Sequence, residues 1–423
     1  MREIVIVISD LYLAQDPSGR SPSLVQGQLD GPPGSGAFPG IEHVARFGER
    51  TALEGGWRPW LARWLGRSDL ANIAPGVIAA VGAVPAATAA VPAAAERPPD
   101  FTAWIATPVH FIAGLASLHL DRRSILRLPA ADLEGFAQDF NRTFGDSGLH
   151  LTPLAAGDFL MQGPAALTAA TTEPARALVA DLEASLPKGN EAKALKRLGA
   201  ELEMWLHEHP LNETRRRSGE LPVSTLWLWG GTPAQAGQSP VLAAGGLALA
   251  GRTPVLSSGD PASAGRAPIL AGGTPAPAAG ARVATPTQQP ASPSASSNTD
   301  TTLAFGNDPY LAGLSRLHGN QTHVLPDQLT DLLTDSRPQR AVLVIEVTSM
   351  LHQNPHWTVL EALAEIDRRF VSPAIAALGE GSLESVVLLA NDAQWRVRRR
   401  DRLKLWRRPR PGISALQAPF SRS

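Results

Sequence analysis

The sequence predicts an α/β fold with a mainly parallel sheet flanked by helices. Three segments are rich in branched apolar residues, as strands buried on both faces of a sheet are: IVIVI at 4–8, AVLVIEV at 341–347 and SVVLLAND at 385–392. The stretch TVLEALAEIDRRFVSPAIAAL at 358–378 has apolar residues three and four apart, which indicates a helix. Strand, helix and strand in this order predict a βαβ unit, which builds parallel sheets.

Length and charge narrow the classes of protein to consider. At 423 residues the chain exceeds the usual single domain, so we expect one large domain with an insertion, or two domains. The formal charge of −1 gives no sign of a polyanion-binding surface, so we expect no nucleic-acid partner. The basic run at 396–410, with Trp395 and Trp406 beside its arginines, is interpreted as a solvated face, and nucleic-acid binding is the alternative.

Neither the N-terminus nor the uncharged segment 73–95 has the features of an export signal or a membrane span. The apolar run in MREIVIVISD is too short for a signal peptide and lacks a cleavage pattern. The segment 73–95 is mostly Ala with prolines spread through it, which indicates a weak helix or a linker. The chain has no cysteine, which excludes disulfides and thiolate metal sites. We expect a cytoplasmic protein with no membrane partner.

Composition and pattern divide the chain into five consecutive segments. Between 233 and 300 the residues are mostly Ala, Gly, Pro, Ser and Thr, with near-repeats, and cannot bury enough apolar surface to offset their ordering entropy. We expect, in order, the first part of a main α/β domain at 1–120, a small inserted α/β module at 121–165 with a helix over 130–144, a return to the main domain at 166–232, a disordered insertion at 233–300, and the last part of the main domain at 301–423.

Aspartates stand at the ends of two predicted strands. Asp10 follows the first strand, and Asp392 ends the last one. Open α/β sheets bind their ligands at the carboxyl ends of the strands, so both carboxylates are expected at one edge, in a candidate site. The alternative for Asp10 is a strand-end or helix-capping aspartate.

A motif in the middle of the chain indicates ancestry. Asn212, Arg215, Gly219 and Pro222 precede the run WLWG at 227–230, in an N-x-x-R-x-x-x-G-x-x-P…WLWG pattern. This pattern resembles the archaeal-type, cofactor-independent phosphoglycerate mutases of the alkaline phosphatase superfamily. Three further stretches are similar to that family or to its bacterial branch of Rpf-type regulatory proteins: FPGIEHVARFGE at 38–49, ILRLPAADLEGFAQDFNRTF at 125–144 and GNDPYLAGLSRLHG at 306–319. The resemblance implies an alkaline-phosphatase-like main domain.

The resemblance also implies a set of site residues. Members of the superfamily move a phosphoryl group through a Ser or Thr nucleophile held between two divalent metals, usually Mn²⁺. The segment RSDLANI at 67–73 resembles the nucleophile motif, with Arg67 in place of a glycine. The implied residues are Ser68 as nucleophile, Asp10, His352 and Asp392 as metal ligands, and Asn212 with Arg215 as substrate-binding groups. A chance match at Ser68, and a cap with a helix-end salt bridge at Asn212 and Arg215, are the alternatives.

Several of the implied ligands are replaced in this chain. Thr348 stands where the family has the aspartate of an Asp-x-x-x-His pair, and Ala393 stands where it has the histidine of an Asp-His pair. The region 395–411 contains no later histidine, and the inserted module lacks the arginine expected at Phe159. Losing these ligands removes most of the charge neutralisation that two-metal catalysis needs. Trp227 and Trp229 are expected in the core, on alternate faces of a strand.

The pattern favours a degenerate phosphoglycerate-mutase-like protein, non-catalytic or weakly active, that binds a small anionic metabolite in a regulatory role. The alternative is an active metal-dependent phosphoryl-transfer enzyme, a mutase or a phosphatase, that uses Ser68. One divalent metal, Mn²⁺ by analogy, is expected if chemistry survives, and none if the site is fully degenerate. A third hypothesis is an interaction scaffold with a protein partner. Surviving chemistry requires that Asp10, Ser68, His352 and Asp392 converge.

Overall fold

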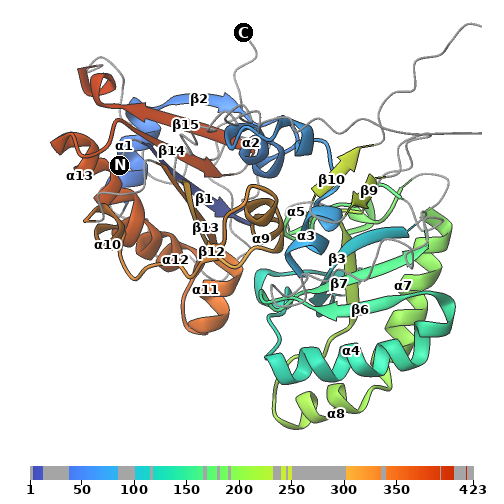
Figure 1. Cartoon of the computed structure of the whole chain (residues 1–423). Coiled ribbons are helices and arrows are strands. Elements are labelled where there is room, and N and C mark those ends of the chain that lie inside the picture. Colours follow the sequence, from blue (N-terminus) through green and yellow to red (C-terminus); the bar gives the residue numbers. More distant parts are fainter. Residues whose placement is uncertain are drawn as a thin grey trace, which may run out of the picture. The chain divides into compact units, whose positions relative to one another are not determined.

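The computed structural model describes most of the chain outside the low-complexity segment (Figure 1). The described residues are 3–12, 38–83, 101–114, 118–164, 169–178, 182–188, 192–231, 240–243, 246–249, 302–334, 340–390, 392–403 and 416. Within these ranges, every helix is too short or too polar to cross a bilayer.

A seven-stranded sheet forms the first layer, in the order β12-β11-β13-β1-β14-β15-β2. Its first five strands pair in parallel, while β15 and β2 are added antiparallel. The predicted parallel sheet is therefore confirmed, because the three branched runs are its central strands. The bounds are β1 Glu3–Ser9, β2 Glu49–Ala52, β11 Thr302–Phe305, β12 Thr322–His323, β13 Arg340–Glu346, β14 Ser385–Ala390 and β15 Ala393–Arg398.

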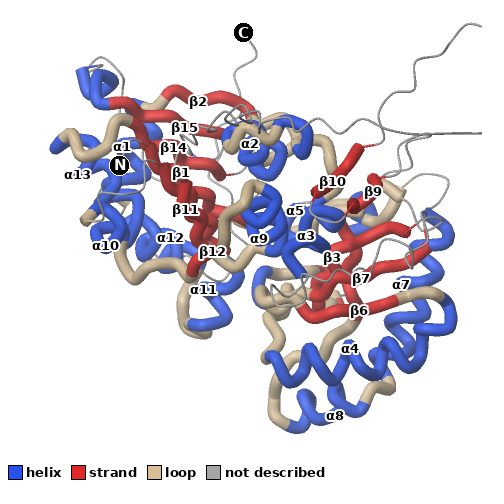
Figure 2. Tube along the Cα trace, viewed as in Figure 1, coloured by secondary structure: helices blue, strands red, loops and turns tan. Residues whose placement is uncertain are grey.

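Helices cover both faces of this sheet, in blue against the red strands of Figure 2. Successive side chains of a strand point to opposite faces, so Ile4, Ile6 and Ile8 enter one core and Val5 and Val7 enter the other. The first face packs against α1 (Pro39–Phe47), α10 (Leu329–Leu333), α11 (Val347–Gln353), α12 (Val359–Ile366) and α13 (Ser372–Glu380). The second packs against α2 (Trp57–Trp64), the 3-10 turn η1 (Ser68–Leu70), α3 (Pro75–Ala83) and α9 (Pro309–Leu317).

A second, antiparallel sheet has the order β6-β7-β3-β8. Its strands and helices come from both sides of the 121–165 segment, so this sheet extends beyond the expected inserted module. The bounds are β3 Phe101–Val109, β6 His150–Pro153, β7 Phe159–Pro164, β8 Thr225–Trp229, α4 Ala130–Phe144, α7 Ala192–His207 and α8 Pro210–Arg217. The short helices α5 (Pro174–Ala177) and α6 (Leu182–Ser185) precede α7.

The two tryptophans of the WLWG run correct one expectation. Trp227 and Trp229 are both buried in a single core cluster, and Leu226 and Leu228 lie in another. Residues two apart in a strand point to the same face, so the prediction of alternate faces was wrong.

The low-complexity segment at 233–300 is described at one place. A two-stranded hairpin joins β9 (Pro240–Ala243) to β10 (Gly246–Leu249). The rest of the predicted disordered insertion lies outside the described residues. A second short hairpin, of β4 (Ile112–Ala113) and β5 (Leu118–His119), follows β3.

Candidate functional site

The carboxyl edge of the seven-stranded sheet carries the two strand-end aspartates. Because β1 and β14 are neighbours in parallel, Asp10 and Asp392 emerge at the same edge, and they line one small cavity there. Both adopt left-handed backbone conformations, with φ of 54° and 58°. The structure therefore brings these two predicted residues together.

The carboxylate of Asp10 is bound by a helix rather than left open. One oxygen accepts the backbone N–H of Val347 and the other accepts that of Thr348, each at 2.8 Å. These are the first residues of α11, so the carboxylate lies at the positive end of that helix. Arg122 donates to the backbone carbonyls of Asp10 and Tyr12. Asp10, which is 8% exposed, thus has the contacts of a helix-capping residue.

The carboxylate of Asp392 is engaged by an arginine. Arg176 donates from Nη1 to Oδ2 at 2.6 Å and from Nη2 to Oδ1 at 2.5 Å. The guanidinium also lies over the ring of Tyr12, 4.6 Å from its centroid. Both oxygens of Asp392 are therefore used within the chain.

His352 lies in the last turn of α11 and faces a backbone carbonyl. Its Nε2 is 2.7 Å from the carbonyl oxygen of Ile125, so this nitrogen carries the proton and donates. Burial lowers the pKa of His352 and favours the neutral ring. Asp10, Asp392 and His352 do not gather into a two-metal centre. Across the described residues, no group of three or more His, Asp or Glu side chains is arranged to hold a metal ion.

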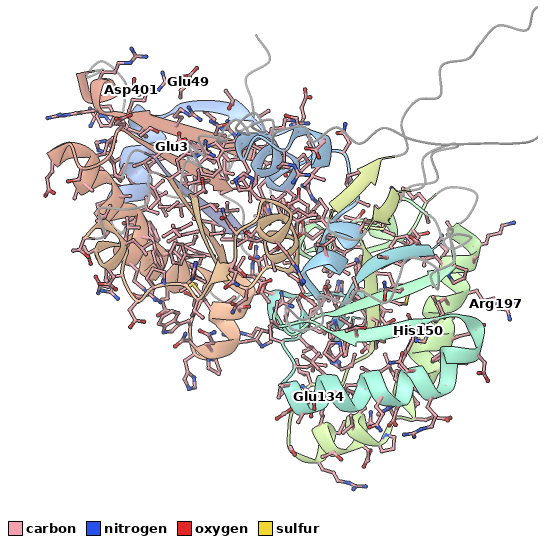
Figure 3. All side chains as sticks on the ribbon, in the orientation of Figure 1. Glu3, Glu49, Glu134, His150, Arg197 and Asp401 are labelled. Carbon is pink, nitrogen blue, oxygen red and sulfur yellow. The ribbon has the colours of Figure 1, made fainter. Side chains whose placement is uncertain are left out.

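Ser68 is separated from Asp10 by the length of α2. This helix begins beside Asp392, since a Cβ added at Gly56 would lie 3.4 Å from the Asp392 carboxylate. At its other end, the indole of Trp64 donates to Glu3, which is labelled in Figure 3 and begins β1. Eight residues of helix rise about 12 Å. The helix therefore runs from the carboxyl edge of the sheet to the amino edge.

The 3-10 turn that contains Ser68 follows α2 at the amino edge. Ser68 is exposed, and neighbouring Arg67 donates to Asp69 and to the carbonyl of Leu317. The pairing of Asp10 with a serine nucleophile, which the resemblance implies, is not assembled in this structure. The two residues lie at opposite ends of the strands.

Asn212 and Arg215 lie in α8 and join this helix to other segments of the chain. The Asn212 amide donates to the carbonyls of Leu206 and Val223, at 2.7 and 2.8 Å, and accepts the N–H of Val223 at 2.7 Å. Arg215 pairs with Asp132 at 2.6 Å and with Glu220 at 2.8 Å. The salt bridges of Arg215 match the alternative interpretation, whereas the residue that caps α8 is His209 rather than Asn212.

Two further arginines at the carboxyl edge were not predicted from the sequence. Arg127 contacts Glu346 at the end of β13, with Nε 3.1 Å from Oε2, and reaches Asp158 at 3.4 Å. Its partners lie 219 and 31 residues away in the chain. No local pattern reports such pairs, because only the folded chain brings them together.

Arg58 occupies a similar buried position. Its Nη2 lies 3.0 Å from Glu173 and 3.1 Å from Asp308. The rings of Trp57 and Trp229 lie beside the guanidinium, with centroids 4.5 and 4.6 Å from its carbon. Rings and carboxylates together hold this cation away from water.

Burial changes the acidity of the carboxylates at this edge. Desolvation, with the charge of Glu346, raises the pKa of Asp10 from its ordinary 3.8 to about 7. Desolvation likewise raises the pKa of Asp158 to about 6, although Arg127 opposes the shift, and it raises the pKa of Asp308. Protonation at this edge therefore changes near neutral pH.

A cavity of about 380 Å³ opens beside this edge. Its volume lies in the range of small-molecule sites. The cavity is bounded by the glycine pairs at 55–56 and 230–231. Its lining includes the side chains of Tyr12, Trp57, Arg58, Arg176, Trp229 and Tyr310.

Asp10 should make stability depend on pH. Its folded pKa is raised, so the stabilisation by its proton is complete below about pH 4 and is lost as the pH rises through about 7. We expect the free energy of unfolding of the wild type to fall over this pH range, and that of Asp10→Asn to lack this fall. The variant should also be less stable at every pH, because an amide cannot accept both N–H groups. Urea unfolding from pH 4 to 8 measures it. Parallel profiles for both proteins would contradict the assignment.

Comparison with known proteins found similarities among solved structures. The sequence matches no protein-family model, and no curated protein matches it. The PH0037 protein from Pyrococcus horikoshii is 11% identical, with 94% of this chain and 87% of that chain covered and a TM-score of 0.41. A cofactor-independent phosphoglycerate mutase from Thermoplasma acidophilum is 12% identical, with 94% and 90% covered and a TM-score of 0.32. Similarity at this level does not assign the chain to a family or a reaction.

Proposed function

We propose that this chain is a binding protein on a phosphoglycerate-mutase-like α/β architecture. It holds a small anionic metabolite at the carboxyl edge of its main sheet and has a regulatory role rather than a catalytic one. The observation that carries this proposal is the 380 Å³ cavity lined by Arg58 and Arg176. Planar guanidinium groups are the side chains best matched to carboxylate and phosphate oxygens.

The lining of the cavity favours an anion. Arg176, the more exposed of the two lining arginines, is the cation that a ligand meets, because Arg58 is paired with Glu173 and Asp308. The ion pairs of Arg58 use Nη2, and its buried Nε has no hydrogen-bond partner among the described residues. The helix α2 also begins at the cavity without a side-chain cap, which adds the positive end of its dipole.

The contacts of the implied catalytic residues support binding over phosphoryl transfer. A nucleophile must lie within bonding reach of the group it attacks, and Ser68 lies beyond the far end of α2 from Asp392. Metal ligands must converge on one point, and within the described residues no group of three or more His, Asp or Glu side chains does so. Binding of an anion requires neither a nucleophile nor a metal.

Isothermal titration with benzoate, 3-phosphoglycerate and inorganic phosphate tests the proposal. We expect saturable binding of at least one of these anions to the wild type. Arg176→Ala should weaken it by tenfold or more, because a charge-assisted hydrogen bond contributes about 1.5–3 kcal/mol. The matched control is Arg197→Ala, on the surface of α7 and labelled in Figure 3, whose side chain is 83% exposed. This control should bind like the wild type.

Two outcomes would overturn the proposal. One is that none of the three anions binds to the wild type. The other is Mn²⁺-dependent turnover of 3-phosphoglycerate, or of a general phosphatase substrate, that Ser68→Ala abolishes. That second result would establish the alternative of an active phosphoryl-transfer enzyme.

A further inference from the structure

The pair formed by Arg176 and Asp392 has the geometry of a bound ligand carboxylate. Two nearly equal bonds, of 2.6 and 2.5 Å, join two guanidinium nitrogens to two carboxylate oxygens. The side chains are 36% and 35% exposed, in contrast to the 9% of Arg58. Arg176 lines the cavity, whereas Asp392 lies in the turn after β14 and lines the neighbouring small cavity. An exchangeable anion thus occupies the most accessible cation of the described lining.

We infer that Asp392 is an internal stand-in for the ligand, and that the ligand is a carboxylic acid with a flat apolar body. The ligand's carboxylate takes the place of Asp392 on Arg176, and the released aspartate turns to water. This inference rests on the proposed function and adds the chemical class of the ligand and the residue that competes with it.

The charges around the cavity favour a single negative charge over two. Arg58 is already balanced by Glu173 and Asp308, at 3.0 and 3.1 Å. A ligand on Arg176 therefore meets one available cation, with Asp392 and Glu173 close to that cation. A phosphate dianion would add a second negative charge with no further cation to balance it, whereas a carboxylate replaces Asp392 charge for charge.

The walls of the cavity favour a flat apolar body. Four aromatic side chains contribute to the lining: Tyr12, Trp57, Trp229 and Tyr310. The glycine pairs at 55–56 and 230–231 add backbone without side chains to the same lining. A cavity with aromatic side chains and bare backbone in its lining accommodates a planar ring better than a hydrated polyol chain.

The backbone at Asp392 allows two clean test variants. Its φ of 58° lies in the left-handed region, which Asn and Gly tolerate better than other residues. Asp392→Asn keeps the shape and removes the competing charge, and Asp392→Gly removes the side chain altogether. Circular dichroism and thermal unfolding verify that both remain folded.

Titration of the two variants with benzoate, inorganic phosphate and 3-phosphoglycerate tests the inference. In the wild type, benzoate should bind more tightly than either phosphate compound. Removing the internal competitor should strengthen benzoate binding by roughly tenfold in both variants, because the Arg176 guanidinium is then free of Asp392 in every molecule. Arg176→Ala should lose benzoate binding, and Arg197→Ala should leave it unchanged.

The contrary results separate the two proposals. Benzoate affinity that is unchanged or weaker in both Asp392 variants would overturn the stand-in role. Tighter binding of phosphate or 3-phosphoglycerate than of benzoate would overturn the ligand class and leave the proposed function intact. If none of the three anions binds to the wild type or to Asp392→Asn, the proposed function fails as well.

Discussion

Replacing Arg127 with methionine should destabilise the protein by about 3–5 kcal/mol, the usual cost of leaving a buried charge without its partner. Arg127 is 12% exposed and contacts Glu346 and Asp158. Glu346 ends β13 of the seven-stranded sheet, and Asp158 directly precedes β7 of the antiparallel sheet. Methionine keeps most of the side-chain volume, so the loss of stability is caused mainly by removal of the charge. Both carboxylates then lack their nearest cation in a site where burial already raises the pKa of Asp158 to about 6.

The pH dependence of Arg127→Met gives the sharper test. Without the cation, the folded pKa of Asp158 rises further, and stability is lost as the pH rises through that value. The gap between wild type and variant should therefore be widest at pH 8 and narrow toward pH 5, as measured by urea unfolding. Arg142→Met is the control, since Arg142 is 70% exposed and pairs with Asp139 one turn away. Its effect should stay within about 0.5 kcal/mol. A loss below about 1 kcal/mol for Arg127→Met at pH 8 would show that the pair contributes little.

Gly313→Ala should cost about 3 kcal/mol, at the upper end of the usual range for overpacking. The helices α3 and α9 cross so closely that a Cβ at Gly313 would lie 1.8 Å from the carbonyl oxygen of Ile78. Backbone cannot rotate away as a flexible side chain can, so one helix must move. Because α9 begins after Asp308, a partner of Arg58, this movement should also weaken anion binding in the cavity.

A matched glycine separates packing from helix propensity. Gly199 lies within α7, where an added Cβ would meet no atom within 4 Å. Gly199→Ala should therefore stabilise the protein by up to about 1 kcal/mol, the ordinary helical advantage of Ala over Gly. Thermal unfolding of both variants measures the difference. A similar change in both would indicate that the contact between α3 and α9 adapts to an added methyl group.

Local patterns predicted the main sheet and one part of the candidate site. The branched runs of β1, β13 and β14 identified buried parallel strands, since strand burial on both faces requires apolar residues in succession. Asp10 and Asp392 could be assigned to one edge for the same reason, because parallel neighbours end together. The helix over 358–378 was likewise confirmed, as α12 and α13 joined by a π-helical turn.

The partners of the polar groups could be learned only from the tertiary structure. Arg176 meets Asp392 across 216 residues and Arg58 meets Asp308 across 250, and charge pairs at such separations leave no periodic trace in a sequence. The residues around Ser68 resemble a nucleophile motif, but the direction of α2 carries that serine to the opposite edge of the sheet from Asp10. By itself, the sequence determined the three central strands of the main sheet and the helices over 130–144 and 358–378, because burial patterns are local. The fold decided which charges neutralise one another, because that depends on how distant segments pack.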